Sequence, residues 1–169
     1  MKTELRIVMY IFLVAGLTAC QKPAAEKKAV VFHSVTGDTL SLALPITYDV
    51  IIRNPNPDDS WTTECLAGMD QEAMTNFIFS ALYEKKLTAY DFYTGKSLSL
   101  RKIRKIEEAM GNDRSRLAKI QFTENWYLDT ARMTLDKKVT SMMFGYEVYN
   151  DNGNVRGYKA AFRVNLNEK

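Results

Sequence analysis

The sequence predicts an α+β fold, in which two helices pack on a mostly antiparallel sheet that ends in a C-terminal hairpin. Two segments, residues 69–86 and 98–110, repeat apolar side chains at three- and four-residue steps, which is the period of a helix. Strand-like alternation runs through residues 117–128, 139–150 and 155–166. We expect one domain over residues 30–169.

The amino terminus has the pattern of a secretory signal. Lys2 and Arg6 precede an apolar run over residues 7–16, which is too short to span a membrane. Residues 17–20, Leu-Thr-Ala-Cys, resemble the lipobox of bacterial lipoproteins. That resemblance implies that residues 1–19 are removed and that Cys20 is acylated on its thiol and on its new amine. The alternative is a cysteine that happens to end a signal peptide cleaved elsewhere.

The lipobox also implies a location. Gln21 follows the cysteine where an aspartate would imply retention in the inner membrane, and no acidic run of the kind carried by surface-exported lipoproteins comes next. We therefore expect a lipid anchor in the cell outer membrane, with the domain on its periplasmic side. Each buried CH2 of an acyl chain contributes roughly 0.8 kcal/mol, and more than one chain gives stable anchoring. Residues 20–29 lack an apolar period and are predicted to be the tether.

Composition and motifs argue against several classes of function. The 23 basic and 20 acidic residues are mixed along the chain and give a formal charge of +3, so no nucleic-acid-binding surface is expected. The one histidine, His33, excludes histidine relays and multi-histidine metal sites. Acylation of Cys20 leaves Cys65 without an intrachain partner, so we expect a small buried side chain there, with an intermolecular bridge as the alternative. No catalytic residue, metal or cofactor is expected.

The amino-terminal part of the domain is predicted to be β-rich. Residues 30–44 alternate weakly around a turn at residues 36–38, and residues 46–52 favour a strand. Two prolines and several Asx residues predict a rigid loop over residues 54–59.

The first predicted helix begins at Asp70, a suitable N-cap, and has Lys85 and Lys86 in its last turn, where they match the helix dipole. Its expected core face is Met69, Ala73, Met74, Phe77, Ile78, Ala81 and Leu82.

The second predicted helix has Ser97 or Ser99 as its cap and ends at Gly111-Asn112. Its apolar stripe is Leu100, Ile103, Ile106 and Met110. Its basic side consists of Arg101, Lys102, Arg104 and Lys105. This side could contact an acidic partner or phospholipid headgroups, but a solvated face with an Arg104 to Glu108 pair is favoured.

The register of the C-terminal hairpin follows from which positions are apolar. Even-numbered positions are apolar in both strands, and a two-residue Asn152-Gly153 turn would place them on opposite faces. We therefore predict a three-residue loop, residues 151–153, with Gly153 left-handed. This loop would place Tyr146 opposite Tyr158 and Met142 opposite Phe162.

Glu124 interrupts the apolar face of the strand over residues 117–128. A carboxylate at that position must be hydrogen-bonded, paired or at an edge. An ion pair with an Arg or Lys is favoured over catalysis. Carboxylates that could serve a glycosidase are Asp58, Asp59, Glu124 and Asp129, but their spacing predicts no particular separation.

Two motifs occur in order along the chain. Residues 82–91, LYEKKLTAYD, contain a helix end, a basic link and an Ala-Tyr turn that includes Tyr90; residues 120–129, IQFTENWYLD, contain Glu124, Trp126 and Asp129 in a Glu-x-Trp-x-x-Asp strand. Both resemble the GldN/PorN family of gliding-motility and type IX secretion proteins. Members are periplasmic, bind a separate outer-membrane lipoprotein and form a ring beneath the membrane.

The resemblance implies a structural role without catalytic residues, so Tyr90, Glu124, Trp126 and Asp129 carry over as motif positions only. The chain differs from the family in two ways: it carries its own lipobox, and residues 46–68 do not resemble the family's longer N-terminal region. These differences imply a diverged relative that anchors itself and has another partner.

We therefore expect a non-enzymatic structural or accessory subunit that contacts protein partners in the cell envelope, such as secretion-ring components. The alternative is a small periplasmic glycan- or peptide-binding lipoprotein. A concave pocket lined by Trp61 and tyrosines would favour glycan binding, a flat apolar patch would favour assembly, and carboxylates converging in a cleft would favour an enzyme.

Overall fold

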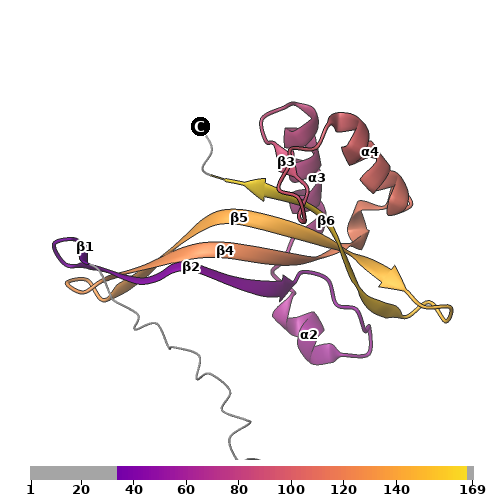
Figure 1. Cartoon of the computed structure of the whole chain (residues 1–169). Coiled ribbons are helices and arrows are strands. Elements are labelled where there is room, and N and C mark those ends of the chain that lie inside the picture. Colours follow the sequence, from indigo (N-terminus) through magenta and orange to yellow (C-terminus); the bar gives the residue numbers. More distant parts are fainter. Residues whose placement is uncertain (1–33, 167–169) are drawn as a thin grey trace, which may run out of the picture. The chain divides into compact units, whose positions relative to one another are not determined.

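A computed structural model describes residues 34–166 of the chain, and the predictions for Cys20, the signal, the tether and His33 fall outside these residues. The described part is an α+β domain, as predicted, with one six-stranded sheet in the order β1-β2-β4-β5-β6-β3 and antiparallel pairing throughout (Figure 1). The strands are β1 (Ser34–Thr36), β2 (Thr39–Ile51), β3 (Ala89–Tyr90), β4 (Leu117–Asp129), β5 (Thr134–Tyr149) and β6 (Val155–Asn165).

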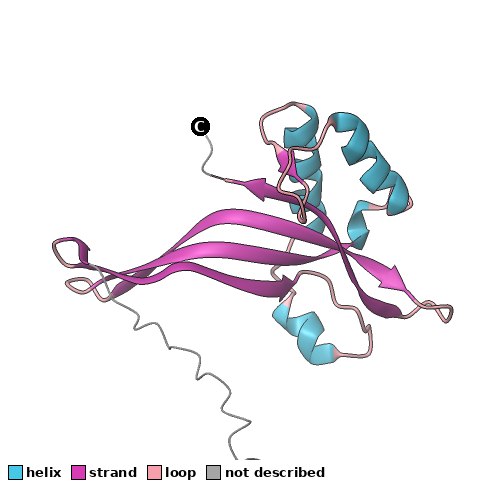
Figure 2. Cartoon of the chain, in the orientation of Figure 1, coloured by secondary structure: helices cyan, strands magenta, loops and turns pink. Residues whose placement is uncertain are grey.

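Two helices, α3 (Gln71–Tyr83) and α4 (Leu100–Ala109), form the core with one face of the sheet. Phe79 of α3 meets Phe162 of β6 edge to face, with ring centroids 5.6 Å apart. Figure 2 shows both helices at one end of the sheet, from which β2, β4 and β5 extend toward the turn between β4 and β5. None of the helices within residues 34–166 is both long enough and apolar enough to cross a bilayer.

The predicted start of α3 is confirmed, but part of its predicted core face is wrong. The Asp70 carboxylate accepts a hydrogen bond from the Ala73 N–H at 2.8 Å. Phe77, predicted to be buried, is 68% exposed, whereas Phe79 is completely buried. The buried residues of α3 include Ile78, Ala81 and Leu82, as predicted, but also Thr75 and Phe79, which the predicted face did not contain, so the buried side is turned toward these two residues. Lys85 and Lys86 lie beyond the end of the helix.

The predicted α4 is confirmed. Ser99 is its N-cap, Ile103 and Met110 are buried, and Gly111 and Asn112 end it with φ angles of 71° and 57°. The predicted pair of Arg104 with Glu108 is wrong, because neither residue is in an ion pair among residues 34–166. The acid of α4 that does form one is Glu107, which pairs with Arg114.

Two short helices were not predicted, α2 (Ser60–Cys65) and the 3-10 helix η2 (Arg114–Arg116). Each begins at an Asx side chain that caps a backbone N–H: Asp59 accepts from Thr62, and Asp113 accepts from Ser115.

The C-terminal loop is as predicted, but the pairing beyond it is not. Gly153 has a φ of 79°, and the Asn150 N–H donates to the Asn154 carbonyl across residues 151–153. Bulges between Val148 and Tyr149 and between Phe144 and Gly145 then shift the register twice. The predicted pairs of Tyr146 with Tyr158 and of Met142 with Phe162 are therefore wrong. The two shifts place Phe144 opposite Phe162 and Met142 opposite Val164, which keeps the apolar side chains on one face.

Candidate functional site

The sheet face that carries the core continues past the helices onto the outer parts of β2, β4 and β5, which we call the arm (residues 39–48, 123–129 and 134–140). Residues directly opposite one another in an antiparallel sheet share a face, so the register identifies the arm face. It consists of three cross-strand rows: Leu40, Leu128 and Leu135; Ala43, Trp126 and Lys137; and Ile46, Glu124 and Val139.

The next two rows connect the arm face to the core. Tyr48 stands opposite Phe122 and Val50 opposite Ile120, and Ile120 is completely buried in the cluster that contains the helices. At the far end, Leu135 is 46% exposed. In Figure 1, α3 and α4 lie at the other end of these strands, so none of the described helices covers the arm face.

Glu124 is buried in the middle of the arm face and is only 4% exposed. Its two carboxylate oxygens accept one hydrogen bond each: the Tyr48 hydroxyl donates to Oε1 at 2.8 Å, and the Trp126 indole Nε1 donates to Oε2 at 2.8 Å. The hydrogen bond to Glu124 raises the pKa of Tyr48, because the phenol must keep its proton to donate it.

The prediction that Glu124 forms an ion pair with an Arg or Lys is wrong. The ion pairs of residues 34–166 do not include it, and its partners are neutral donors. Lys137, the residue opposite Trp126, places its ammonium 4.4 Å from the centre of the indole rings. Tyr48 was missed as a partner, although it continues the alternation of the strand predicted over residues 46–52.

Asp129, the last motif position, closes the turn at the end of the arm. Its Oδ1 accepts hydrogen bonds from the backbone N–H groups of Ala131 and Arg132 at 3.0 and 2.9 Å. The motif therefore has a local physical explanation, since Glu124 holds Trp126 and Asp129 shapes the turn that connects β4 to β5.

The other predicted site residues lie elsewhere. Tyr90 is in β3, where its ring faces the Arg163 guanidinium 5.9 Å away. Arg101, Lys102, Arg104 and Lys105 are all exposed along α4. The structure therefore brings Glu124 and Trp126 together but not the basic side chains or Tyr90.

Several other expectations are corrected by the position of the side chains. Cys65 is exposed at the end of α2, not buried, because that helix buries no residue. The four carboxylates named as glycosidase candidates do not converge in one cleft. Asp58 is exposed beside Asp59, which caps α2, whereas Glu124 is inside the arm and Asp129 caps a turn.

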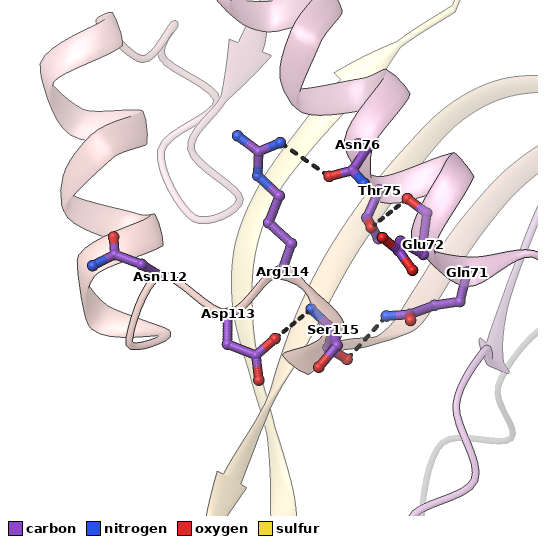
Figure 3. A pocket seen from close by; sticks show the side chains of 8 residues that line it. All are labelled: Gln71, Glu72, Thr75, Asn76, Asn112, Asp113, Arg114 and Ser115. Atoms are coloured by element: carbon purple, nitrogen blue, oxygen red, sulfur yellow. Dashed lines mark hydrogen bonds between the residues drawn. The ribbon is translucent and has the colours of Figure 1, made fainter.

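A cavity of about 440 Å3 lies between α3 and the loop that leads into β4 (Figure 3). Its lining is polar: Gln71, Glu72, Thr75, Asn76, Asn112, Asp113, Arg114 and Ser115. Hydrogen bonds join the two walls of the cavity, α3 and the loop before β4. The Gln71 side chain donates to the Ser115 and Leu117 carbonyls at 2.9 and 2.7 Å. Arg114 likewise donates to Asn76 at 3.1 Å.

Asp113, one of the two acids that line this cavity, does not suit the role of a general acid. A general acid at neutral pH needs a raised pKa. The hydrogen bond from Ser115 instead lowers the pKa of Asp113. No aromatic residue lines this cavity or a second one of about 320 Å3 beside the start of α4. Within residues 34–166, no three His, Cys, Asp or Glu side chains are grouped so that they could hold a metal ion.

A second buried acid, Glu147, was not singled out from the sequence. It is 1% exposed, and its Oε2 accepts from the Tyr149 hydroxyl and from Arg53 at 3.2 Å. Arg116 donates to the Glu147 carbonyl at 2.7 Å. This network fastens the loop after β2 to β5 and has a structural explanation.

Comparison with known protein families and with curated proteins gave no match. The resemblance to the GldN/PorN family therefore rests on the two stretches of sequence around Tyr90 and Trp126.

Proposed function

We propose that this chain is a lipid-anchored, non-enzymatic subunit that docks a protein partner in the cell envelope through the arm face. Anchoring through Cys20 at the periplasmic side of the outer membrane would keep the domain near membrane-bound assemblies. As a diverged relative of the GldN/PorN family, the chain would act as a structural or accessory component related to gliding motility or type IX secretion.

The observation that carries the proposal is the arm face itself. It continues the apolar face of the core beyond the helices, and it carries half-buried Leu40, Leu128 and Trp126 together with exposed Leu135. None of the described helices covers this face, and apolar surface that a fold leaves uncovered is typical of protein contact sites. Tryptophan is also enriched among the interface residues that contribute most of the binding energy.

Glycan binding is less well supported. The expected sugar platform required Trp61 and tyrosines around a concave pocket, but Trp61 is 73% exposed and lines neither described cavity. Aromatic rings on which a sugar could stack do not line these two cavities.

A site-specific photocrosslinker tests the proposal in intact cells. At position 135 it would project from the arm face; at neighbouring Asp136, it would project from the opposite face of β5, because adjacent strand residues alternate. We expect a discrete crosslinked envelope protein from position 135 and little from position 136. Secretion-ring components in that product would support the family relationship. Equal crosslinking from both positions, or none from position 135, would contradict docking through the arm face.

A further inference from the structure

We infer that the arm face accepts an arginine-bearing apolar segment of its partner, with the guanidinium seated against the aromatic cluster around Glu124. The inference rests on the proposed docking function and adds the chemistry of the partner. Three features of the arm face lead to it: a buried negative charge with neutral partners, aromatic rings that donate to that charge, and a cation already held by one of those rings.

The first feature is the charge of Glu124. Both carboxylate oxygens are hydrogen-bonded at 2.8 Å, but the donors are a phenol and an indole, and no ion pair of the described residues contains this carboxylate. Hydrogen bonds reduce the cost of burying an ionised group, but a positive charge nearby compensates it more fully. A cationic side chain from outside would therefore be attracted to this part of the face.

The second feature is the pair of rings, Tyr48 and Trp126, whose polar groups donate to the carboxylate. A hydrogen bond donated to an anion polarises the donor, so electron density moves into the Tyr48 and Trp126 rings. The faces of such rings attract cations. Tyr48 lies beside Phe122 with their ring centroids 6.0 Å apart, which places two half-buried aromatic rings next to Glu124.

The third feature shows this attraction within the chain. The Lys137 ammonium lies 4.4 Å from the Trp126 ring centre, although Lys137 is an exposed residue that could extend into solvent. Since Lys137 covers the indole, a cation from a partner would take the Tyr48 side of the cluster.

Arginine suits this position better than lysine. Its guanidinium is planar, stacks on aromatic faces and is more weakly hydrated than an ammonium, so moving it onto a half-buried ring costs less. The aliphatic side chains around the cluster, Ile46, Leu128 and Leu135, would contact apolar residues on either side of the arginine.

The test uses the full chain with 15N-labelled tryptophan, which gives two indole signals because the sequence has only Trp61 and Trp126. The probe is the peptide acetyl-Leu-Ser-Arg-Ser-Leu-amide, in which an extended backbone places the two leucines and the arginine on one side. The matched peptide replaces arginine with neutral citrulline. We expect the Trp126 indole signal to shift saturably while the Trp61 signal stays in place. The citrulline peptide should bind roughly three- to thirtyfold more weakly.

Glu124→Gln should reduce the preference for arginine over citrulline, because it removes the charge and leaves the rings, whereas Glu84→Gln, at an exposed acid, should preserve it. Tyr48→Phe provides a second variant if Glu124→Gln unfolds the arm, because it removes one donor and leaves the ring, and it should reduce the same preference.

Equal binding of the two peptides, or no Trp126 shift with either, would overturn the arginine inference. Crosslinking from position 135 would then still stand as independent support for docking. Preferential binding of the arginine peptide without any crosslink from position 135 would instead count against the proposed function.

Discussion

Arg53 Nη1 lies 3.2 Å from Glu147 Oε2, and the two side chains of this ion pair are very unequally buried. The Glu147 side chain is 2% exposed, whereas the Arg53 side chain is 41% exposed. Loss of Arg53 should therefore destabilise the fold more than loss of the Glu147 charge. Water can solvate an Arg53 guanidinium without its partner, but it cannot reach the buried Glu147 carboxylate.

We expect Arg53→Ala to lower the free energy of unfolding by roughly 3 kcal/mol, the low end for breaking a buried pair. Glu147→Gln should cost less, about 1 kcal/mol, because its amide oxygen can still accept from Tyr149 and Arg53 returns to water. Urea unfolding of both variants measures the difference. Lys86→Ala is the control: it breaks the exposed pair with Glu84 and should change stability by less than about 0.5 kcal/mol. A larger loss for Glu147→Gln than for Arg53→Ala would contradict this explanation.

The two long helices have N-caps of different quality, and this gives a matched pair of variants. The Asp70 side chain accepts from the Ala73 N–H, whereas Ser99 makes no side-chain capping hydrogen bond at the start of α4. Asp70→Ala should therefore cost about 1 kcal/mol of stability, and Ser99→Ala clearly less. Urea midpoints of the two variants, measured beside the parent protein, test the comparison. Equal losses would show that the capping bond of Asp70 contributes little.

The proposed lipid anchor at Cys20 can be tested without knowing the partner. Cys20→Ser should abolish incorporation of an alkyne fatty-acid probe, because in the proposed lipoprotein both acylation and processing would require this cysteine. Labelled cells are lysed, and the protein is captured and examined by gel fluorescence, with Cys65→Ser as the control that should retain the label. Persistent labelling of Cys20→Ser, or a mature amino terminus at another residue by mass spectrometry, would defeat the lipoprotein assignment.

Local patterns predicted the elements that are determined locally. The alternation over residues 117–128 reproduces β4 within one residue, Asp70 caps its helix as expected, and Gly153 takes the left-handed conformation that the three-residue loop requires. The Asp70 cap and the Gly153 turn depend on residues a few positions away, and the extent of β4 follows from its own alternation, so the sequence pattern contains all three.

Features that depend on distant residues could not be predicted in this way. The register shift beside Gly145 belongs to the pairing of β5 with β6, and Gly145 also stands opposite Lys119 of β4, so this region is set by pairing among three strands. Glu124 was correctly singled out as unusual, but its partner Tyr48 is 76 residues away, and only the β2–β4 register brings them together.

Tyr83 gives a pH-dependent test of the packing between α3 and α4. Burial, followed by the hydrogen bond that its hydroxyl donates to Glu107, raises the pKa of Tyr83 from 10.0 to about 12. Between these two pH values the unfolded chain loses the phenol proton while the folded protein keeps it, so unfolding releases a proton and stability falls as the pH rises. The contribution of Tyr83 is thus complete below pH 10 and lost by about pH 12.

Tyr83→Phe removes this contribution, so its stability should decrease less steeply than that of the parent protein from pH 10 to pH 12. Other tyrosines with raised pKa values, Tyr48, Tyr149 and Tyr158, are present in both proteins, and their effects cancel in the comparison. Urea unfolding followed by circular dichroism at intervals across this pH range provides the two curves. If they run parallel, the Tyr83 phenol titrates alike in the folded and unfolded chains, and its hydrogen bond to Glu107 does not hold the proton.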